Sequence, residues 1–445
     1  MFRVRLEKLK FSSKFIFIPF IIVAVLMFVA IIHYGVNTPF WDQWEMVPLF
    51  EAVSHHTLSL ADLWRQHNEH RTFFPNIVLL ICAYITHWNT HIEMLVGLCF
   101  AIVSASLIVL MLKKSIVKLW LGLIAAVLIA VWFFSPVQWE DWLWGWQVEW
   151  FMCVAAVTTS IFSLTRFTEK SAHRRIAIFV LAILSGIIGS YSLAGGLIVW
   201  PVGLFILVAM KQAKKLWGSW TVIGILAAAL YYYHYIPQPG PNGATTTFFL
   251  HHPLSFIEFF FALIGGSVGS VSGDLQAPVL IGAILLTSLV PILYLVWNRR
   301  SDIHRYIPWL AFILFGLLAA ASTDVGRLSY GVGFALSSRY TAFSTLFIIG
   351  VTAIIIILLD GLKTPSKEFN QVVVTCLLLV SLPLVISSYS VGIQGFRSQS
   401  QLLKEIDVCT HVANPANACL SLTYPSSTVV RPRLEFLKAK HWAGY

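Results

Sequence analysis

Long apolar runs recur along the whole chain, and this feature limits what the chain can fold into more than any other. A helix needs about 20 apolar residues to cross the roughly 30 Å hydrocarbon core of a bilayer. Only 11% of the residues are charged and 58% are hydrophobic, whereas soluble domains carry about 25% charged residues. Lipid offers no hydrogen-bond partners, so such runs must satisfy their backbone groups inside helices. The sequence therefore predicts an all-α polytopic membrane protein.

We expect about eleven membrane-spanning helices, within a range of roughly 10 to 13. They cover residues 15–36, 93–112, 119–134, 150–167, 176–191, 196–210, 216–236, 278–297, 306–322, 341–359 and 371–390. Basic residues gather on the cytoplasmic side of membrane proteins. With these spans, 20 of the 30 Lys and Arg residues fall on one side. That side is taken as the cytoplasm, which places the N-terminus inside and the C-terminus outside.

Two further apolar stretches, 73–88 and 254–271, are expected to lie at the outer interface or to re-enter the membrane. If either one crossed, the basic clusters that follow would change sides. The chain then divides into a module at 1–236 with a large outer loop at 37–92, further spans at 237–390, and an outer tail at 391–445.

The net charge of +10 does not indicate nucleic acid, because the bases form short clusters at the ends of apolar runs. Membrane lipid is the expected partner instead. The inner loops contain no Gly-rich phosphate loop followed by lysine. A nucleotide on the inner side is therefore not expected as a direct substrate.

The first polar motif is FWDQWE, which follows the first predicted span. Asp42 and Glu45 are three residues apart, so on a helical turn they share a face. One interpretation is an interfacial aromatic belt, formed by Trp41 and Trp44, with solvated acids beside it. The other is a general base at the membrane surface, with its pKa raised by the desolvating indoles.

The second motif is HNEHR at 67–71, which directly precedes an apolar helix. Glu69 and His70 could bind a divalent cation such as Mg or Mn. Arg71 could bind a phosphate through paired hydrogen bonds. The alternative is an ordinary polar cap on an interfacial helix.

The third motif, QWEDWLWGWQVEW at 138–150, holds five tryptophans with the acids Glu140, Asp141 and Glu149. Tryptophan belts are common in membrane proteins. Aromatic faces such as that of Trp144, placed beside carboxylates, also suit the apolar C–H face of a sugar ring.

The fourth motif is DVGRLSYGVGFALSSRY at 324–340. Its glycines permit close backbone approach. Arg327 and Arg339 suit a lipid phosphate, and the alternative is snorkelling at a helix end.

Four of the six cysteines lie in apolar runs and are expected to be small buried apolar groups. Cys409 and Cys419 lie in the polar tail, where a disulfide is plausible if the tail is outside the cytoplasm.

The order of these motifs resembles the GT-C superfamily of membrane glycosyltransferases, which use polyprenyl-phosphate sugars. In such proteins an acid follows the first span, and a polar cluster ending in proline precedes an interfacial helix. Two spans around a basic inner turn come next, and an outer loop with an acid follows. Here these are Asp42, Glu69-His70-Arg71 before Pro75, Lys113-Lys114, and Glu140-Asp141. FWDQWE, QHNEHR and the late SSRY are similar to bacterial members that modify O-antigen.

The resemblance implies an inverting transferase in a bacterial inner membrane, acting at the periplasmic face. Its donor would be a polyprenyl-phosphate-linked sugar, and its acceptor a cell-envelope glycan or glycolipid. Asp42 would be the base, with Glu45 and Glu69 as further catalytic candidates. The expected phosphate contacts are Arg71, Arg327, Arg339 and Tyr340. The expected sugar or acceptor contacts are Trp41, Trp44, His70, Glu140, Asp141 and Trp144.

The sequence departs from the GT-C pattern at two places. Gln43 stands where many members have a second acid, and the turn SYSLAGG lacks a lysine that some members have. A transporter or flippase for lipid-linked sugars is one alternative, although charges inside the predicted spans are few. An O-antigen polymerase or ligase is another, although the largest outer loop here comes first rather than late.

Overall fold

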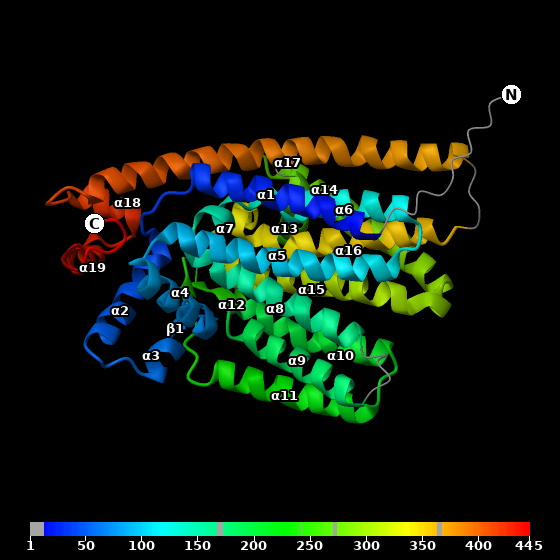
Figure 1. Cartoon of the computed structure of the whole chain (residues 1–445), viewed down its shortest axis with the longest axis horizontal. Helices are drawn as coiled ribbons and strands as arrows, with labels where there is room; N and C mark the ends of the chain where they lie inside the picture. Colours follow the sequence, from blue (N-terminus) through cyan, green and yellow to red (C-terminus); the bar gives the residue numbers. More distant parts are fainter. Residues whose placement is uncertain (1–12, 167–171, 242, 270–273, 363–366) are drawn as a thin grey trace.

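The structure is a computed structural model that describes residues 13–166, 172–241, 243–269, 274–362 and 367–445. It is a bundle of helices with a common long axis (Figure 1). The longer helices are α1 (Ile18–Tyr34), α5 (Thr90–Ser115), α6 (Leu119–Phe133), α8 (Val148–Thr165), α9 (Ala172–Ser190), α10 (Val199–Ala209), α11 (Lys214–Tyr232), α13 (Pro253–Gly269), α14 (Gln276–Asn298), α15 (Ile303–Arg327), α16 (Thr341–Asp360) and α17 (Lys367–Thr410).

Shorter elements connect these helices. The α-helices and strands among them are α2 (Val47–Ser54), α3 (Leu60–Trp64), β1 (Gln66–His67), β2 (His70–Arg71), α4 (Phe73–Thr86), α7 (Trp139–Leu143), β3 (Pro239–Gly240), β4 (Gly243–Ala244), α12 (Thr245–His251), α18 (Asn417–Thr423) and α19 (Ser427–Lys440). The 3-10 turns are η1 (Ser13–Phe17), η2 (Trp41–Met46), η3 (Pro136–Gln138), η4 (Gly145–Gln147), η5 (Ala194–Ile198), η6 (Arg300–Asp302), η7 (Leu328–Tyr330), η8 (Val332–Leu336) and η9 (Ser338–Tyr340). Two antiparallel hairpins, β1–β2 and β3–β4, are the strand pairs among the described residues.

The bundle is that of a polytopic membrane protein. Among the described residues, nine helices are long and apolar enough to cross a bilayer, and each coincides with a predicted span. The other two predicted spans correspond to Ala194–Ala209 and to α11. The first is short of a full crossing, because a helix rises about 1.5 Å per residue. The number of helices that are long and apolar enough to cross a bilayer, nine among the described residues, is lower than the predicted eleven.

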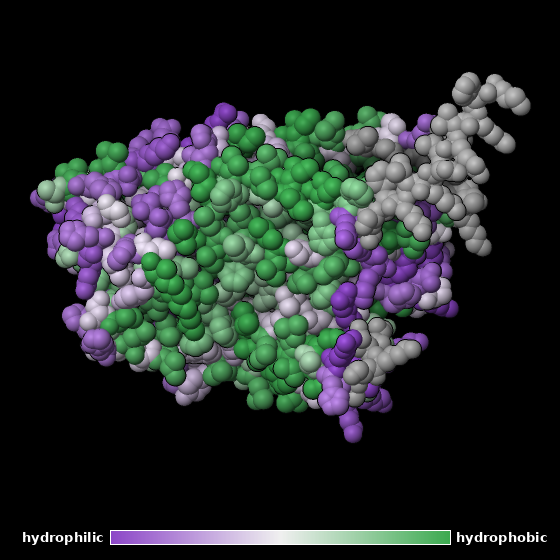
Figure 2. All heavy atoms as spheres, in the orientation of Figure 1, coloured by the Kyte–Doolittle hydropathy of each residue, from purple (hydrophilic) through white to green (hydrophobic). Residues whose placement is uncertain are grey.

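The face of the bundle seen in Figure 2 is hydrophobic in its middle and carries hydrophilic residues toward both ends. One end carries η2, α2–α4, the β1–β2 hairpin, α18 and α19, and we call it the pocket end. The opposite end carries the start of α15 and the end of α16, and we call it the basic end. This banded surface is what a bilayer with water on both sides requires.

Predicted cytoplasmic residues come together at the basic end. The Asp360 carboxylate pairs with Arg305 and accepts hydrogen bonds from the backbone N–H groups of Val117 and Lys118, at 3.1 and 2.8 Å. Arg299 donates to the Leu358 carbonyl oxygen. Since a buried carboxylate is costly unless paired, Asp360 fixes the α5–α6 turn against α15 and α16.

The two predicted interfacial stretches behave differently. The stretch 73–88 forms α4, a 14-residue amphipathic helix at the pocket end. The stretch 254–271 forms α13, whose middle residues Ala262, Leu263 and Ile264 are buried. It runs antiparallel to α14 where Gly265 and Gly282 allow the two backbones to meet. An interfacial position for α13 is thus wrong, because the helix packs inside the bundle, whereas re-entry stays a prediction.

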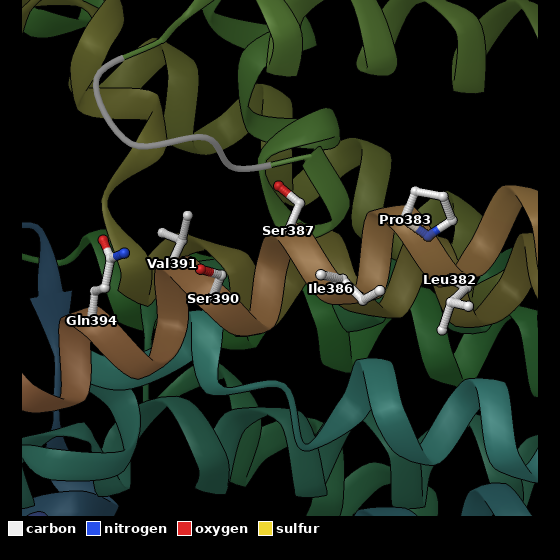
Figure 3. A pocket seen from close by; sticks show the side chains of 7 residues that line it. All are labelled: Leu382, Pro383, Ile386, Ser387, Ser390, Val391 and Gln394. Atoms are coloured by element: carbon white, nitrogen blue, oxygen red, sulfur yellow. The ribbon is translucent and has the colours of Figure 1, made fainter.

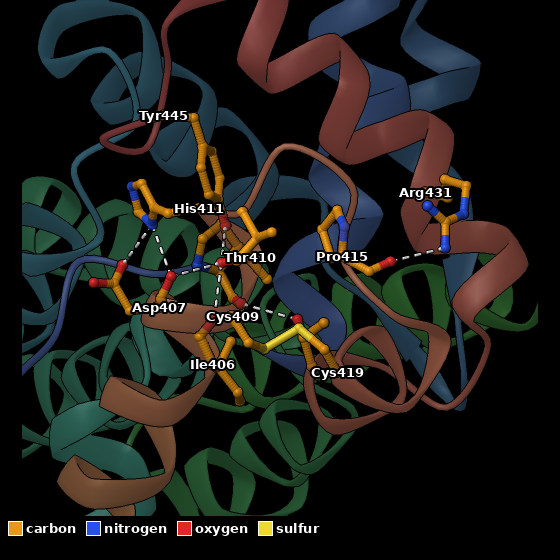
Figure 4. The surroundings of a disulfide bond; sticks show 12 residues. Ile406, Asp407, Cys409, Thr410, His411, Pro415, Cys419, Arg431 and Tyr445 are labelled. Atoms are coloured by element: carbon orange, nitrogen blue, oxygen red, sulfur yellow. Dashed lines mark hydrogen bonds and ion pairs between the residues drawn. A yellow bond between two sulfur atoms is a disulfide. The ribbon is translucent and has the colours of Figure 1, made fainter.

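The tail is tied to the pocket end. Helix α17 runs the length of the bundle, and Cys409 in its last turn is disulfide-bonded to Cys419 in α18, its predicted partner (Figure 4). The final residues dock on the first loop: the Trp442 ring lies 5.2 Å from that of Phe50, and Ala443 donates its N–H to the His87 carbonyl oxygen at 2.8 Å.

Replacing Asp360 with asparagine tests the anchor at the basic end. We expect Asp360→Asn to lower the free energy of unfolding by about 3 kcal/mol, because the partly buried Arg305 loses its countercharge. The midpoint of thermal unfolding in detergent measures this. Asp302→Asn, at an exposed position of the same end, is the control, and equal midpoints for the two variants would contradict the anchor.

Candidate active site

A polar cavity of about 720 Å³ opens at the pocket end. Four separate parts of the chain line it: the first loop, the Trp-rich segment, the η7–η9 segment and the tail. Eight of the predicted site residues face it, namely Trp41, Asp42, His70, Glu140, Trp144, Arg327, Arg339 and Tyr340. The other five do not line it, namely Trp44, Glu45, Glu69, Arg71 and Asp141. The structure thus unites most of a site that the sequence scatters over about 300 positions.

The η2 turn presents Asp42 to the cavity, and hydrogen bonds of buried side chains fix this turn. Gln43, directly beside it, is buried; its amide oxygen accepts from the Phe40 N–H at 3.2 Å, and its amide nitrogen donates to Glu93 Oε2 at 2.6 Å. The Trp88 indole donates to the other Glu93 oxygen at 2.8 Å. The turn also places Trp41 at a φ of 47°, an uncommon conformation for a bulky residue. Such strain persists only where neighbours fix the backbone, as they do here.

The Asp42 carboxylate faces positive groups across the cavity. His67 Nε2 lies 3.6 Å from Asp42 Oδ1. Burial raises the pKa of Asp42, but the hydrogen bond and charge of His67 and the charge of Arg339 outweigh it, so the pKa of Asp42 lies below its ordinary value. The expectation that desolvation would raise this pKa is therefore wrong. Asp42 is ionised throughout the neutral pH range.

The HNEHR motif forms the β1–β2 hairpin, in which His67 pairs with His70 across a two-residue turn. Asn68 in that turn has a φ of 48°, which asparagine tolerates better than most residues. The hairpin is fastened to the chain after α11, because Gln66 Nε2 donates to the Ile236 carbonyl oxygen at 2.7 Å and Gln66 Oε1 accepts from the Ile236 N–H at 3.0 Å.

His70 is a neutral imidazole with a defined tautomer. Burial, with a smaller contribution from the His67 charge, lowers the pKa of His70 to about 3. Its Nδ1 accepts from the Ala194 N–H at 3.3 Å, so the proton resides on Nε2. Nε2 lies 3.4 Å from Glu69 Oε1. His70 is thus a neutral neighbour of Glu69 rather than its ionic partner.

Glu69 and His70 do not form a convincing metal site. The described residues contain no group of three or more His, Cys, Asp or Glu side chains placed to hold a metal ion. The Glu69 oxygen nearest to His70 is also paired with Arg327. A cation on Glu69 and His70 would have two protein ligands and would have to displace an arginine, so these residues do not fit the metal expected from the sequence.

Arg71 has a structural position. Its side chain is buried and donates to three backbone carbonyl oxygens, those of Trp64 at 3.0 Å, Tyr231 at 3.2 Å and Tyr233 at 2.7 Å. Its guanidinium also lies over the Trp64 ring. These contacts favour joining the hairpin to the end of α11 over the predicted phosphate contact.

Glu140 and Arg339 face the cavity from adjoining segments. The Glu140 N–H donates to Ser338 Oγ at 3.1 Å, and Glu140 Oε2 accepts from the Arg339 N–H, also at 3.1 Å. The Arg339 guanidinium lies over the rings of Phe334 and Tyr340, and its charge interacts with those of Glu140 and Asp42. Asp141, one residue further, is buried outside the cavity lining, and neither of its carboxylate oxygens has a hydrogen-bond partner among the described residues.

Glu45 and Trp44 hold the tail instead of facing the cavity. Glu45 Oε1 accepts from Arg433 Nη1 at 2.8 Å and from the Tyr424 hydroxyl at 2.9 Å. Burial alone would raise the pKa of Glu45. The hydrogen bonds from Arg433 and Tyr424 and the charge of Arg433 outweigh this effect, so the pKa of Glu45 lies below its usual value. The Trp44 indole donates to Thr423. These contacts bring Tyr424 and Pro425 to the cavity wall.

The comparisons with known proteins add little to this geometry. No protein-family model and no curated protein matches the chain. A solved structure that is similar is the crystal structure of the Archaeoglobus fulgidus oligosaccharyltransferase in complex with Zn and sulfate, at 15% sequence identity and a TM-score of 0.38. The match covers 87% of this chain and 55% of that one, so the chain spans about half the length of the oligosaccharyltransferase. A likeness at this level carries no argument about activity.

Several cavity residues were not among the sequence candidates: His67, Trp146, Gln147, Glu149, Trp150, Gln399 and Tyr424. Glu149 and the tryptophans lie within the Trp-rich motif, so the motif was a usable signal for them. Tyr424 is brought in by the tail, and no local pattern marks it.

A second hollow, of about 610 Å³, lies along α17 (Figure 3). It is lined by Leu382, Pro383, Ile386, Ser387, Ser390, Val391 and Gln394. None of these described residues is ionisable, so this hollow offers no acid, base or charge for catalysis.

The structural position of Arg71 can be tested by truncation. We expect Arg71→Ala to lower the free energy of unfolding by about 3 kcal/mol, because three carbonyl oxygens lose a charged donor. Thermal unfolding measures this, with the more exposed Arg65→Ala as the control. A variant of full stability with weaker binding of undecaprenyl phosphate would restore Arg71 as a phosphate ligand.

Proposed function

We propose that the protein is an inverting glycosyltransferase of the GT-C type. It transfers a sugar from a polyprenyl-phosphate donor to a cell-envelope glycan or glycolipid, such as O-antigen. The proposal rests on one observation, the polar cavity at the end of an apolar bundle, which combines an ionised carboxylate, the half-buried Arg339 and tryptophan faces. A lipid-linked sugar requires this combination: apolar surface for the lipid, positive charge for the phosphate, and aromatic and polar groups for the sugar.

Asp42 is the general base in this proposal. Its carboxylate is charged at neutral pH and accepts the proton of the acceptor hydroxyl as that oxygen attacks the anomeric carbon. The low pKa of Asp42 makes it a weak base. Its contribution therefore comes mainly from fixed position and from a negative charge near the positive charge that develops on the sugar.

Arg339 is the proposed phosphate ligand, and Arg327 is the weaker candidate. The Arg327 guanidinium is already paired with Glu69. The Arg339 guanidinium is held over the two aromatic rings, with Asp42 and Glu140 as its charged neighbours. An arginine in this setting can stabilise the charge that develops on the leaving lipid phosphate.

The side of the membrane follows from charge. The basic end holds Arg299, Arg305 and Lys118, and the positive-inside rule places such an end in the cytoplasm. The cavity then opens on the periplasmic face of a bacterial inner membrane, where a Cys409–Cys419 disulfide is stable.

Loss of the base should abolish transfer. We expect Asp42→Asn to lower kcat about 100-fold or more with little change in the melting temperature. The assay follows radiolabelled hexose from undecaprenyl phosphate to envelope glycan, with purified protein in detergent. Glu51→Gln, on α2 outside the cavity lining, is the control. Normal turnover by Asp42→Asn would move the base elsewhere, and lipid-linked sugar flipping without transfer by the wild type would favour a transporter.

The His67 partner should set the acid limit of activity. The pKa of Asp42 is depressed partly by His67, so the carboxylate of the wild type stays ionised to a lower pH than an ordinary aspartate does. His67→Gln removes the charge that lowers the pKa of Asp42, so burial raises that pKa above its wild-type value. Activity should therefore decline at a higher pH on acidification. Profiles of kcat/KM from pH 4 to 8 measure this, with His55→Gln as the control, and coincident acid limbs would exclude the coupling.

A further inference from the structure

One wall of the polar cavity carries polar groups whose hydrogen-bonding capacity the protein leaves unused. They are Glu149 Oε2 and the amide oxygen of Gln147, which have no hydrogen-bond partner among the described residues, and the hydroxyl of Tyr340, which interacts with the Arg339 guanidinium and keeps its own proton to donate. All three residues line the cavity. Their exposed fractions are 4% for Glu149, 1% for Gln147 and 4% for Tyr340.

Buried polar atoms in native proteins almost always have partners, so unused ones need an explanation. Leaving such a group without a partner is costly, and a site that does so rejects ligands that cannot supply the missing half of the bond. The Gln147 amide oxygen is an acceptor only, whereas the Glu149 carboxyl group also donates when it is protonated, and the Tyr340 hydroxyl can do either. Their complement is a ligand that offers several hydrogen-bond donors at close spacing.

The position of this wall points to the sugar rather than to the lipid or the phosphate. The Glu149 carboxylate interacts with the charges of Asp42 and Arg339 and with the indole of Trp146. The Trp146 ring lies 4.9 Å from the His67 ring, and His67 in turn contacts Asp42. Glu149 is therefore next to the proposed base and the proposed phosphate ligand, where the transferred ring would lie.

Aromatic surface completes the wall. Trp150 follows Glu149 directly, and its ring centroid is 5.9 Å from that of Tyr340. Both rings line the cavity. A pyranose has apolar C–H faces and donor hydroxyls around its edge, so it can contact indole with one part and acceptors with the other.

We propose that Gln147, Glu149 and Tyr340 form a subsite that recognises the ring hydroxyls of the transferred sugar. The subsite rests on the proposed function for its donor, a neutral hexose on polyprenyl phosphate. Glu149 and Gln147 accept hydrogen bonds from ring hydroxyls, and the Tyr340 hydroxyl bonds to a third. These residues determine which sugar is taken, whereas Arg339 binds the phosphate whatever sugar it carries.

Binding without turnover tests this subsite. The probes are undecaprenyl phosphate alone and undecaprenyl phosphate bearing glucose, galactose, mannose or glucosamine. Quenching of tryptophan fluorescence reports occupancy, because Trp144, Trp146 and Trp150 line the cavity. The wild type is compared with Glu149→Gln and Tyr340→Phe. Glu435→Gln and Tyr233→Phe, at exposed positions outside the cavity lining, are the matched controls. Melting temperatures verify that each variant is folded.

We expect the wild type to bind at least one neutral hexose lipid about tenfold or more tightly than bare undecaprenyl phosphate. Glu149→Gln should lose about tenfold of that preference and keep wild-type affinity for the bare lipid, whereas Tyr340→Phe should lose a smaller part of the preference. The controls should keep the whole preference.

Three results would overturn the subsite. The first is a wild type that binds every sugar lipid no more tightly than bare undecaprenyl phosphate. The second is variants whose affinities for the bare lipid and for the sugar lipid fall equally. The third is a preference confined to glucosamine, which would assign Glu149 to an ammonium group. The result is separable from the proposed transfer. A hexose preference lost in Glu149→Gln, in a protein that transfers nothing, would keep the subsite and reject the transferase. Sugar transfer by the wild type, together with a hexose preference that Glu149→Gln leaves unchanged, would keep the transferase and reject the subsite.

Discussion

Charge buried in an apolar bundle must be compensated close by, and this constraint organises both ends of the molecule. At the basic end, Asp360 is enclosed by Arg305 and by two backbone N–H groups. In the cavity, Arg339 lies within reach of the charges of Asp42 and Glu140. These partners come from the first loop, the Trp-rich segment and a late loop, so compensation at one point joins three distant parts of the chain. The cavity therefore forms where the positive charge of Arg339 and the negative charges of Asp42 and Glu140 can neutralise one another.

The sequence was sufficient for the bundle and for most of the cavity. Nine expected spans coincide with long apolar helices because hydropathy is a local property. Asp42, Glu140 and Arg339 could be recognised because a charge in an apolar chain is rare and therefore conspicuous. What each polar residue contacts depends on tertiary partners, which no local pattern encodes. Glu45 resembles Asp42 in motif and position, yet Arg433 and Tyr424 draw it into holding the tail.

Gln43 stands where many members of the GT-C superfamily have a second acid, and the structure offers a physical reason for a glutamine at this position. This residue accepts from the Phe40 N–H and donates to Glu93 at the same time. A carboxylate at position 43 could accept but could not donate, and it would face the Glu93 carboxylate. A second acid beside Asp42 would therefore disrupt the turn that presents Asp42 to the cavity. The wrong expectation for the pKa of Asp42 arose because Trp41 adjoins Asp42 in the sequence, whereas the contact between His67 and Asp42 is made only in the folded chain.

The tail that covers the cavity also fixes the order in which the site can be assembled. Glu45 and Trp44 belong to the first loop, whereas their partners Arg433, Tyr424 and Thr423 follow α17. During synthesis the bundle is inserted while Glu45 still lacks its arginine, and the wall formed by Tyr424 and Pro425 is absent. Only when α17 has crossed and the tail has folded back does the cavity close on that side. The chain thus completes its polar cavity last, after the helices of the bundle are in place.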